Sequence, residues 1–309
     1  MSIDLSKLDN THRILFNIPL RPIQGDRFQP TGFPSLGAAT YQTKDGTKLL
    51  VESAQSMANR LEATMWDEAA QKPVEDASDI SYIRVERNGQ FLTSSILEAH
   101  RINSPYILSD KGFFEELKES IGDLGNGPFR KKLLETLLKY DANSLIHGVF
   151  LEKIAGRLRI DRSLSAFVEA EGVELAASGG VKNDHVDPSG SFGSSKTGFG
   201  NVPFARDEYT AQKIVLYVNL DLDQIRGYGL GQDATRLLIV LALYKVRALL
   251  SGSLRFRTAC DLEPEEDTVS AVRPSDFVLP SLPELSVALK EAIQLNKPVF
   301  KQTVVQFND

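Results

Sequence analysis

A run of polar side chains at the predicted start of a helix is the strongest candidate for chemistry in this sequence. The run consists of Ser53, Gln55, Ser56, Asn59 and Arg60. A helix that begins here presents backbone amides, hydroxyls and a guanidinium, a combination that binds phosphate groups. The alternative is that Ser53 caps the helix and the other side chains form an ordinary solvated face. We expect Glu52 and Glu62 to be partners of these polar groups rather than metal ligands.

Two arginines form a second candidate. Arg255 and Arg257 alternate along a predicted strand over residues 254–259, so both point to the same face. Arginine binds phosphate and stacks against unpaired bases, which are the two features of a nucleic-acid strand. The alternative is that both arginines form salt bridges within or between subunits.

The segment 178–203 is a third candidate because it is rich in glycine and serine. A backbone of this composition is costly to order, so we predict a long loop rather than a packed element. Lys182, Asn183, His185 and Lys196 on such a loop fit a clamp that becomes ordered when it binds nucleic acid. The segment lacks the spacing of a phosphate-binding P-loop. The alternative is a disordered surface insertion that binds nothing.

Catalytic or metal chemistry has weaker support. Asp184, His185 and Asp187 lie close in sequence, but a metal site needs convergent ligands, and no second histidine is near. Asp221 and Asp223 sit where a strand is predicted to end, which favours a turn or helix cap over a catalytic pair. We expect the lone Cys260 to be a buried structural thiol. The sequence therefore predicts no catalytic residue, no metal and no cofactor.

Composition sets the remaining limits. The chain has 309 residues, 42% of them hydrophobic and 25% charged, as in ordinary globular proteins. One cysteine rules out an internal disulfide and suits the cytoplasm. The most apolar stretch, 237–250, contains two cations, so we predict a buried helix and no membrane span. The net charge of −6 argues against a nucleic-acid partner, but the stretch 234–260 carries five basic and no acidic residues, which permits a local basic groove.

The order of predicted elements favours an α+β fold. Strands alternate with helices and one hairpin is marked by Asn88-Gly89, so a split βαβ, ferredoxin-like core with large insertions is the simplest arrangement. We predict a single elaborated domain over residues 1–309, with the insertion at 178–203 and an acidic C-terminal helix and strand within 261–309. The predicted strands are 11–18, 48–51, 144–151, 211–221, 254–259 and 299–307, with a hairpin at 80–93. The predicted helices follow residue 53 and cover 128–140, 234–250 and 283–296.

Five local signatures along the chain carry a resemblance to a known family. They are 50–62 (LVESAQSMANRLE), 100–106 (HRINSPY), 178–184 (SGGVKND), 201–210 (NVPFARDEYT) and 255–263 (RFRTACDLE). Together they resemble the RAMP-superfamily backbone protein of type I-G (formerly I-U) CRISPR interference complexes. The resemblance spans roughly residues 11–265, and it adds Arg101 and Arg206 to the candidate nucleic-acid contacts.

The resemblance implies an RRM-like palm with a protruding thumb that polymerises along the CRISPR RNA. The implied partners are that RNA, the target DNA strand through the guide, further copies of the chain, other Cascade subunits and a recruited helicase–nuclease. Base pairing would then read the sequence, while the protein contacts phosphate and sugar. The alternative is a metal-dependent ribonuclease of the same superfamily, using Asp184 or Asp221. No membrane partner is implied.

Overall fold

A seven-stranded sheet lies at the centre of the computed structural model, which describes residues 3–33, 37–122, 129–155 and 158–308. Its strands are β1 (Arg13–Pro22), β4 (Thr40–Thr43), β5 (Gly46–Glu52), β12 (Leu164–Glu171), β15 (Lys213–Asp221), β16 (Leu254–Arg257) and β17 (Cys260–Pro264). They run in the order β16-β17-β1-β15-β12-β5-β4, and every neighbouring pair is antiparallel. The fold is therefore mixed α+β, as the sequence predicts.

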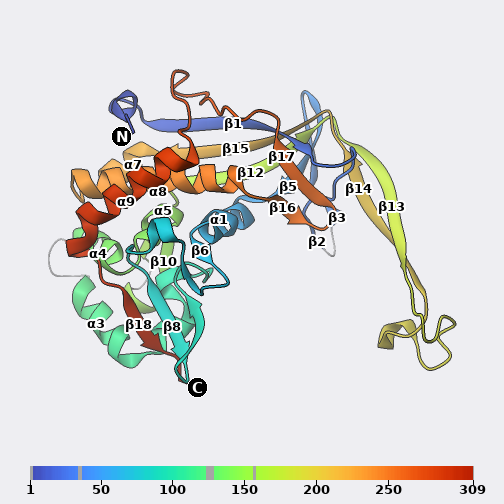
Figure 1. Ribbon diagram of the computed structural model, residues 1–309, viewed down its shortest axis with the longest axis horizontal. Coiled ribbons are helices and arrows are strands. Elements are labelled where there is room, and N and C mark those ends of the chain that lie inside the picture. The colour runs from blue at the N-terminus through green and yellow to red at the C-terminus, as the bar shows by residue number, and fades with distance from the viewer. Residues whose placement is uncertain (1–2, 34–36, 123–128, 156–157, 309) are drawn as a thin grey trace.

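The central sheet buries one of its faces. In β15, Ile214, Leu216 and Val218 are buried, while Tyr217 and Asn219 on the opposite face are half-exposed. Helices α1 (Ala54–Ala63) and α8 (Gln232–Ser251) cover the buried face, and α1 packs on β12 (Figure 1). The four-residue spacing of Met57, Leu61 and Met65 predicts this contact, and all three side chains are buried.

Helix α8 forms the middle of the core because it is apolar on nearly every side. Leu237, Val240 and Leu241 are fully buried. Helix α9 (Leu282–Asn296) packs along it, and helices α1, α5 (Ala142–His147) and α7 (Leu222–Gly227) touch it as well. None of the helices in the described part of the chain is long and apolar enough to cross a membrane.

A second group of elements lies below α1 and α8 in Figure 1. Its three-stranded sheet has the order β18-β8-β9, in which β18 is parallel to β8. Asn88 and Gly89 join β8 to β9 with φ angles of 54° and 74°, as the predicted primed turn requires. The elements are η3 (Arg101–Asn103), α2 (Pro105–Leu108), α3 (Lys111–Ile121), α4 (Phe129–Tyr140), β8 (Ile83–Arg87), β9 (Gln90–Ser94), β10 (Val149–Leu151), α6 (Glu152–Ala155), β11 (Leu158–Ile160) and β18 (Thr303–Gln306). Shorter strands are β2 (Gly32–Phe33), β3 (Gly37–Ala38), β6 (Trp66–Asp67) and β7 (Lys72–Pro73).

The predicted strand over residues 144–151 is wrong. Helix α5 occupies 142–147, Gly148 ends it with a φ of 77°, and only β10 is extended. All six residues of α5 are buried. A fully buried helix has the same run of apolar and small residues as a fully buried strand, so the sequence pattern does not distinguish them. Pro128, predicted in the first turn of the helix at 128–140, lies outside the described residues.

The predicted glycine-rich loop is in part a strand pair. Strands β13 (Glu174–Lys182) and β14 (Val202–Thr210) form a two-stranded antiparallel ribbon that leaves the body at one end of the central sheet (Figure 1). Residues 178–182 and 202–203 belong to this ribbon, and residues 183–201 form its tip. Gly179 permits the pairing, because a Cβ atom there would lie 2.4 Å from the Phe204 carbonyl oxygen. Cross-strand pairing thus overrides the low strand preference of glycine.

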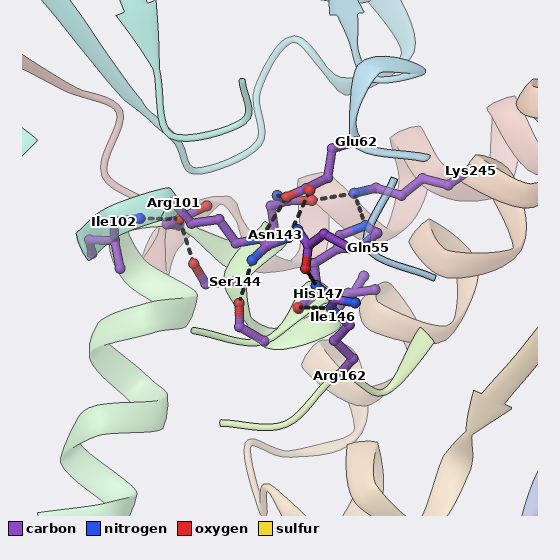
Figure 2. A network of polar contacts seen from close by, with 12 residues as sticks. Gln55, Glu62, Arg101, Ile102, Asn143, Ser144, Ile146, His147, Arg162 and Lys245 are labelled. Atoms are coloured by element: carbon purple, nitrogen blue, oxygen red, sulfur yellow. Dashed lines mark hydrogen bonds and ion pairs between the residues drawn. The ribbon is translucent and has the colours of Figure 1, made fainter. Parts of the chain in front are cut away.

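A buried network of polar groups joins α1 to η3, α5 and α8 (Figure 2). Arg101 donates from Nε and Nη2 to the two Glu62 carboxylate oxygens at 2.6 and 2.8 Å. Asn143 donates to Glu62 at 2.7 Å and accepts from Lys245, whose Nζ also lies 3.0 Å from His147 Nε2. Each of these five residues is at most 4% exposed.

Burial changes the proton affinities in this network. It lowers the pKa of Lys245 from 10.5 to about 7, because a charged ammonium loses hydration there. Burial also lowers the pKa of His147 well below its usual value, and the neighbouring Lys245 charge adds to this effect. The pKa of Asp141, a buried carboxyl next to the network, rises to about 7 for the same reason.

We expect the buried Lys245 to make folding stability rise between pH 7 and 9. In this range the unfolded lysine keeps its proton and the folded one loses it, so the free energy of unfolding rises by up to about 1.4 kcal/mol per pH unit. The pKa of Cys260, raised to about 12 by burial, opposes this trend as the pH approaches 9 and beyond it, because the unfolded thiol then loses its proton. Urea unfolding at several pH values should show a flatter profile for Lys245→Met than for the wild type. Lys196→Met, at an exposed lysine, should keep the wild-type slope; equal slopes for all three proteins would contradict the expectation.

Candidate nucleic-acid interface

The start of α1 presents a polar surface to solvent. Ser53 is the N-cap and accepts from the Ser56 backbone amide at 3.2 Å, so the capping role proposed as an alternative is confirmed. Gln55 and Asn59 are exposed, and Ser56 is half-exposed. Gln55 accepts from Arg162, which also donates to the carbonyl oxygens of Ala54 and His147.

Arg162 belongs to this surface, although the sequence analysis missed it. It stands alone in sequence, just before β12, and only the fold brings it to the first turn of α1. Burial lowers its pKa, and its three hydrogen-bond partners hold the guanidinium against the helix start. Arg162 thereby fixes where Gln55 lies.

Arg60 and Arg257 converge on one buried carboxylate. Arg257 Nη2 lies 2.5 Å from Glu52 Oε2, and Arg60 Nε lies 3.7 Å from Glu52 Oε1. Arg60 also donates to the carbonyl oxygens of Arg255 and Phe256, and its guanidinium stands 4.9 Å from the centre of the Phe256 ring. The contacts of Arg60 connect α1 to β16. The ion pair with Glu52 is the salt bridge that the sequence analysis gave as the alternative role of Arg257.

Arg255, by contrast, points to solvent. Its side chain is exposed, and within the described residues no carboxylate lies at ion-pair distance from it. We use the name helix-start surface for Gln55, Ser56, Asn59 and Arg255, which Arg60 brings together across α1 and β16.

Arg101 and Arg206 occupy different environments. Arg101 is 4% exposed and its guanidinium is taken up by Glu62 and the Gly148 carbonyl oxygen, so the structure places this predicted contact in the interior. The predicted nucleic-acid contact of Arg101 is therefore wrong, and Arg101 forms an ion pair in the core. Arg206 lies on the ribbon strand β14 and donates to Glu208 at 2.5 Å, with about a third of its side chain exposed.

The remaining predicted contacts lie at the ribbon tip or at the last residue of β13 next to it, far from α1 (Figure 1). Lys182, Asn183, His185 and Lys196 are all exposed. Lys182 donates to the Gly198 carbonyl oxygen across the tip. The structure therefore separates the predicted residues into a helix-start surface and a ribbon tip.

Two aspartates organise the ribbon tip internally. Asp184 accepts from the backbone amides of Val186, Asp187 and Gly200 at 2.9–3.0 Å. Asp187 accepts from the Phe192 amide at 2.7 Å and from the hydroxyls of two serines. These backbone hydrogen bonds lower the pKa of both carboxyls, that of Asp187 to about 2. Both carboxylates hold the loop together and have little capacity left for a metal.

Several apolar side chains along the ribbon are exposed to solvent. The most exposed ones are Leu175 (61%), Val181 (54%), Val186 (85%), Phe192 (71%) and Phe204 (50%). Exposed apolar groups on a protruding element indicate a contact with bases or with another protein. The tip is thus folded by its carboxylates and presents apolar groups outward.

The other candidates for chemistry have structural roles. Asp221 caps α7 through the Gln224 amide and pairs with Arg13 at 2.6 Å, as the cap interpretation predicts. Asp223 pairs with His12 at 2.7 Å. Cys260 is buried, and burial raises the pKa of its thiol to about 12. Across the described ranges, no three His, Cys, Asp or Glu side chains are arranged to hold a metal ion.

We expect Asp187→Ala to loosen the ribbon tip without changing the body. The substitution removes the acceptor for the Phe192 amide and two hydroxyls, so amide hydrogen exchange in residues 187–192 should become faster. The melting temperature should stay close to that of the wild type, because the tip contributes nothing to the core. Asp207→Ala, at an exposed ribbon position, serves as the control. Unchanged exchange at Phe192 would contradict the role given to Asp187.

Comparison with solved structures finds similar chains. One is in "CRISPR RNA-guided surveillance complex, pre-nicking", with 14% identity, 84% of this chain and 77% of that chain covered, and a TM-score of 0.44. Thermofilum pendens Csc2 has 12% identity over 96% of this chain and 81% of its own, with a TM-score of 0.35. A chain of "CRISPR RNA-guided surveillance complex" has 12% identity over 77% and 71%, with a TM-score of 0.28.

Sequence comparison gives the firmer result. Among curated proteins no relative matches. The family model described as "CRISPR-associated protein GSU0053 (Cas_GSU0053)" matches residues 14–175. This range covers just over half of the chain and includes α1, the buried Glu62–Arg101 pair and Arg162. The chain therefore belongs to the CRISPR-associated GSU0053 family.

Proposed function

We propose that this chain is a CRISPR RNA-binding backbone subunit of a type I-G Cascade-like interference complex and has no catalytic role of its own. The observation that carries the proposal is the pair of separate polar surfaces in a member of a CRISPR-associated family: the helix-start surface and the protruding ribbon tip. In this proposal the helix-start surface contacts RNA phosphates and the ribbon acts as the thumb.

The proposed palm is the central sheet with α1 and α8. Gln55, Asn59 and Arg255 supply exposed donors on it, and the anchored Arg60 keeps them at fixed positions relative to one another. On the ribbon, Lys182, Asn183, His185 and Lys196 are available for phosphates, and the exposed Phe192 and Phe204 are available for bases. A chain of such subunits would follow the guide and present its bases to the target DNA strand.

The proposed partners are further copies of the chain, other Cascade subunits and a recruited helicase–nuclease that cuts the target. The exposed apolar side chains of the ribbon support a contact with a neighbouring copy, since in a single subunit they stay in water and do not stabilise the fold. We place the complex in the cytoplasm.

The alternative function, a metal-dependent ribonuclease using Asp184 or Asp221, has less support. Asp184 accepts three backbone amides, and Asp221 is shared between a helix cap and Arg13. Incubation of the assembled complex with complementary RNA and magnesium separates the two functions. Cleavage lost in Asp184→Ala or Asp221→Ala would favour the ribonuclease.

Co-purifying RNA tests the backbone proposal directly. Protein co-expressed with its CRISPR array should carry RNA of defined length, seen as a raised ratio of absorbance at 260 to 280 nm. Arg255→Gln should weaken RNA binding and lower the dependence of log K on log salt by about 1, because one phosphate contact is lost. Arg273→Gln, at an exposed arginine that bridges to Leu15 of β1 and not to α1 or β16, is the matched control. The proposal fails if the wild type carries no RNA; an unchanged Arg255→Gln removes that residue from the interface.

A further inference from the structure

The β10–β11 hairpin carries an exposed aromatic ring beneath an exposed arginine. Phe150 pairs directly with Arg159 across the two strands, and the Arg159 guanidinium stands 5.7 Å from the centre of the Phe150 ring. Val149, Leu151 and Ile160 point the other way and are buried. The pair therefore faces solvent, and Phe150 is 42% exposed.

A further cation lies near this pair. Lys153 is the second residue after β10, in helix α6, and it is exposed, as is the neighbouring Glu152. In the part of the chain that the structure describes, no carboxylate lies at ion-pair distance from Lys153 or Arg159. We use the name hairpin surface for Phe150, Lys153 and Arg159.

The sequence segment that contains the hairpin has a charge opposite to that of the whole chain. Residues 129–162 contain eight Lys and Arg against four Asp and Glu, and one of those acids, Asp141, is buried. The chain as a whole carries −6. The composition of this segment therefore favours an anionic polymer more than the composition of the whole chain does.

The root of the hairpin is rigid. Gly148 has a φ of 77°, and a Cβ atom there would lie 2.6 Å from the Ile160 carbonyl oxygen. The Gly148 carbonyl oxygen accepts from the buried Arg101 at 3.0 Å. The same network that holds α1 thus fixes the root of the hairpin, from which Phe150 projects into solvent.

We infer that the hairpin surface binds single-stranded nucleic acid, with a base stacked on Phe150 and phosphates held by Arg159 and Lys153. A ring accessible on one face can stack a base only when that base is free of a duplex. Unpaired guanidinium and ammonium groups around it match phosphates. A protein partner is less well matched, because one ring is too small an apolar anchor for an interface.

The hairpin surface is connected to the helix-start surface. Arg162 lies three residues after Arg159 and reaches Gln55 at the start of α1. A strand that crosses the helix-start surface can therefore continue over the hairpin. This inference rests on the proposed function only for the identity of the strand, which is either the guide or the strand paired to it.

Two variants of the full-length chain test the inference, with fluorescein-labelled 20-nucleotide oligo(U) and oligo(dT) as probes. Phe150→Ala should weaken binding at least about fivefold through the lost stacking. Arg159→Gln should weaken it and lower the salt dependence by about one phosphate contact. The matched control is Lys118→Gln, which removes a lysine that stands over Phe114 in an acidic stretch of α3. Thermal melting of each variant checks that the fold is kept.

A second arm measures the RNA that co-purifies with each variant and the binding of a DNA strand complementary to it. Loss of co-purifying RNA assigns the hairpin surface to the guide, and loss confined to the added DNA assigns it to the second strand. Affinities of Phe150→Ala and Arg159→Gln within twofold of Lys118→Gln in both arms would overturn the inference. Absence of RNA from the wild type would contradict the proposed function and not this inference. In that case the oligonucleotide titration alone tests whether the hairpin surface binds nucleic acid.

Discussion

The buried ion pair between Glu62 and Arg101 holds the rest of the architecture in register. Both charges are removed from water, which costs several kcal/mol for each, and only a well-satisfied geometry offsets this cost. Here the guanidinium meets both carboxylate oxygens, Asn143 donates to the carboxylate, and the Gly148 carbonyl oxygen takes another guanidinium proton. Arg101 also has a φ of 51°, a strained value for a residue with a side chain. The pair thus keeps η3 in a conformation that the backbone alone would not choose.

The residues of helix α1 have three different roles. Met57 and Leu61 bind the helix to the sheet, Glu62 locks its last turn to η3 and α5, and Gln55 and Asn59 remain in solvent. Because a helix repeats every 3.6 residues, Gln55 and Glu62 lie on the same side of α1 but about two turns apart, whereas Met57 and Leu61 lie on a different side. The polar side chains at the helix start therefore lie on a fixed support, because the last turn of α1 is held by the Glu62–Arg101 ion pair. An interface that binds a repeating backbone benefits from such a fixed support, since less conformational entropy is lost on binding.

The sequence could predict what depends on local chemistry. The capping role of Ser53, the apolar face of α1, the Asn88-Gly89 turn and the cap at Asp221 all follow from short-range patterns, and the structure confirms each of them. Contacts across long sequence separations were beyond such reasoning. Arg101 meets Glu62 across 39 residues, and Arg162 meets Gln55 across 107, so neither arginine could be assigned from its neighbours. The ribbon was missed for the same reason, because β13 is stabilised by pairing with β14 and not by its own glycine-rich sequence.

The net charge of the chain gives a misleading view of its surface. Two acids are used internally in ion pairs: Glu52 by two arginines and Glu62 by Arg101. A carboxylate that is neutralised at short range produces little field at a distance, whereas an unpaired arginine such as Arg255 or Arg159 keeps its full attraction for phosphate. The paired Arg257 is the counterexample on the same strand, since its charge is cancelled by Glu52. An acidic chain can therefore bind an anionic polymer, provided that its cations rather than its carboxylates are left unpaired at the surface.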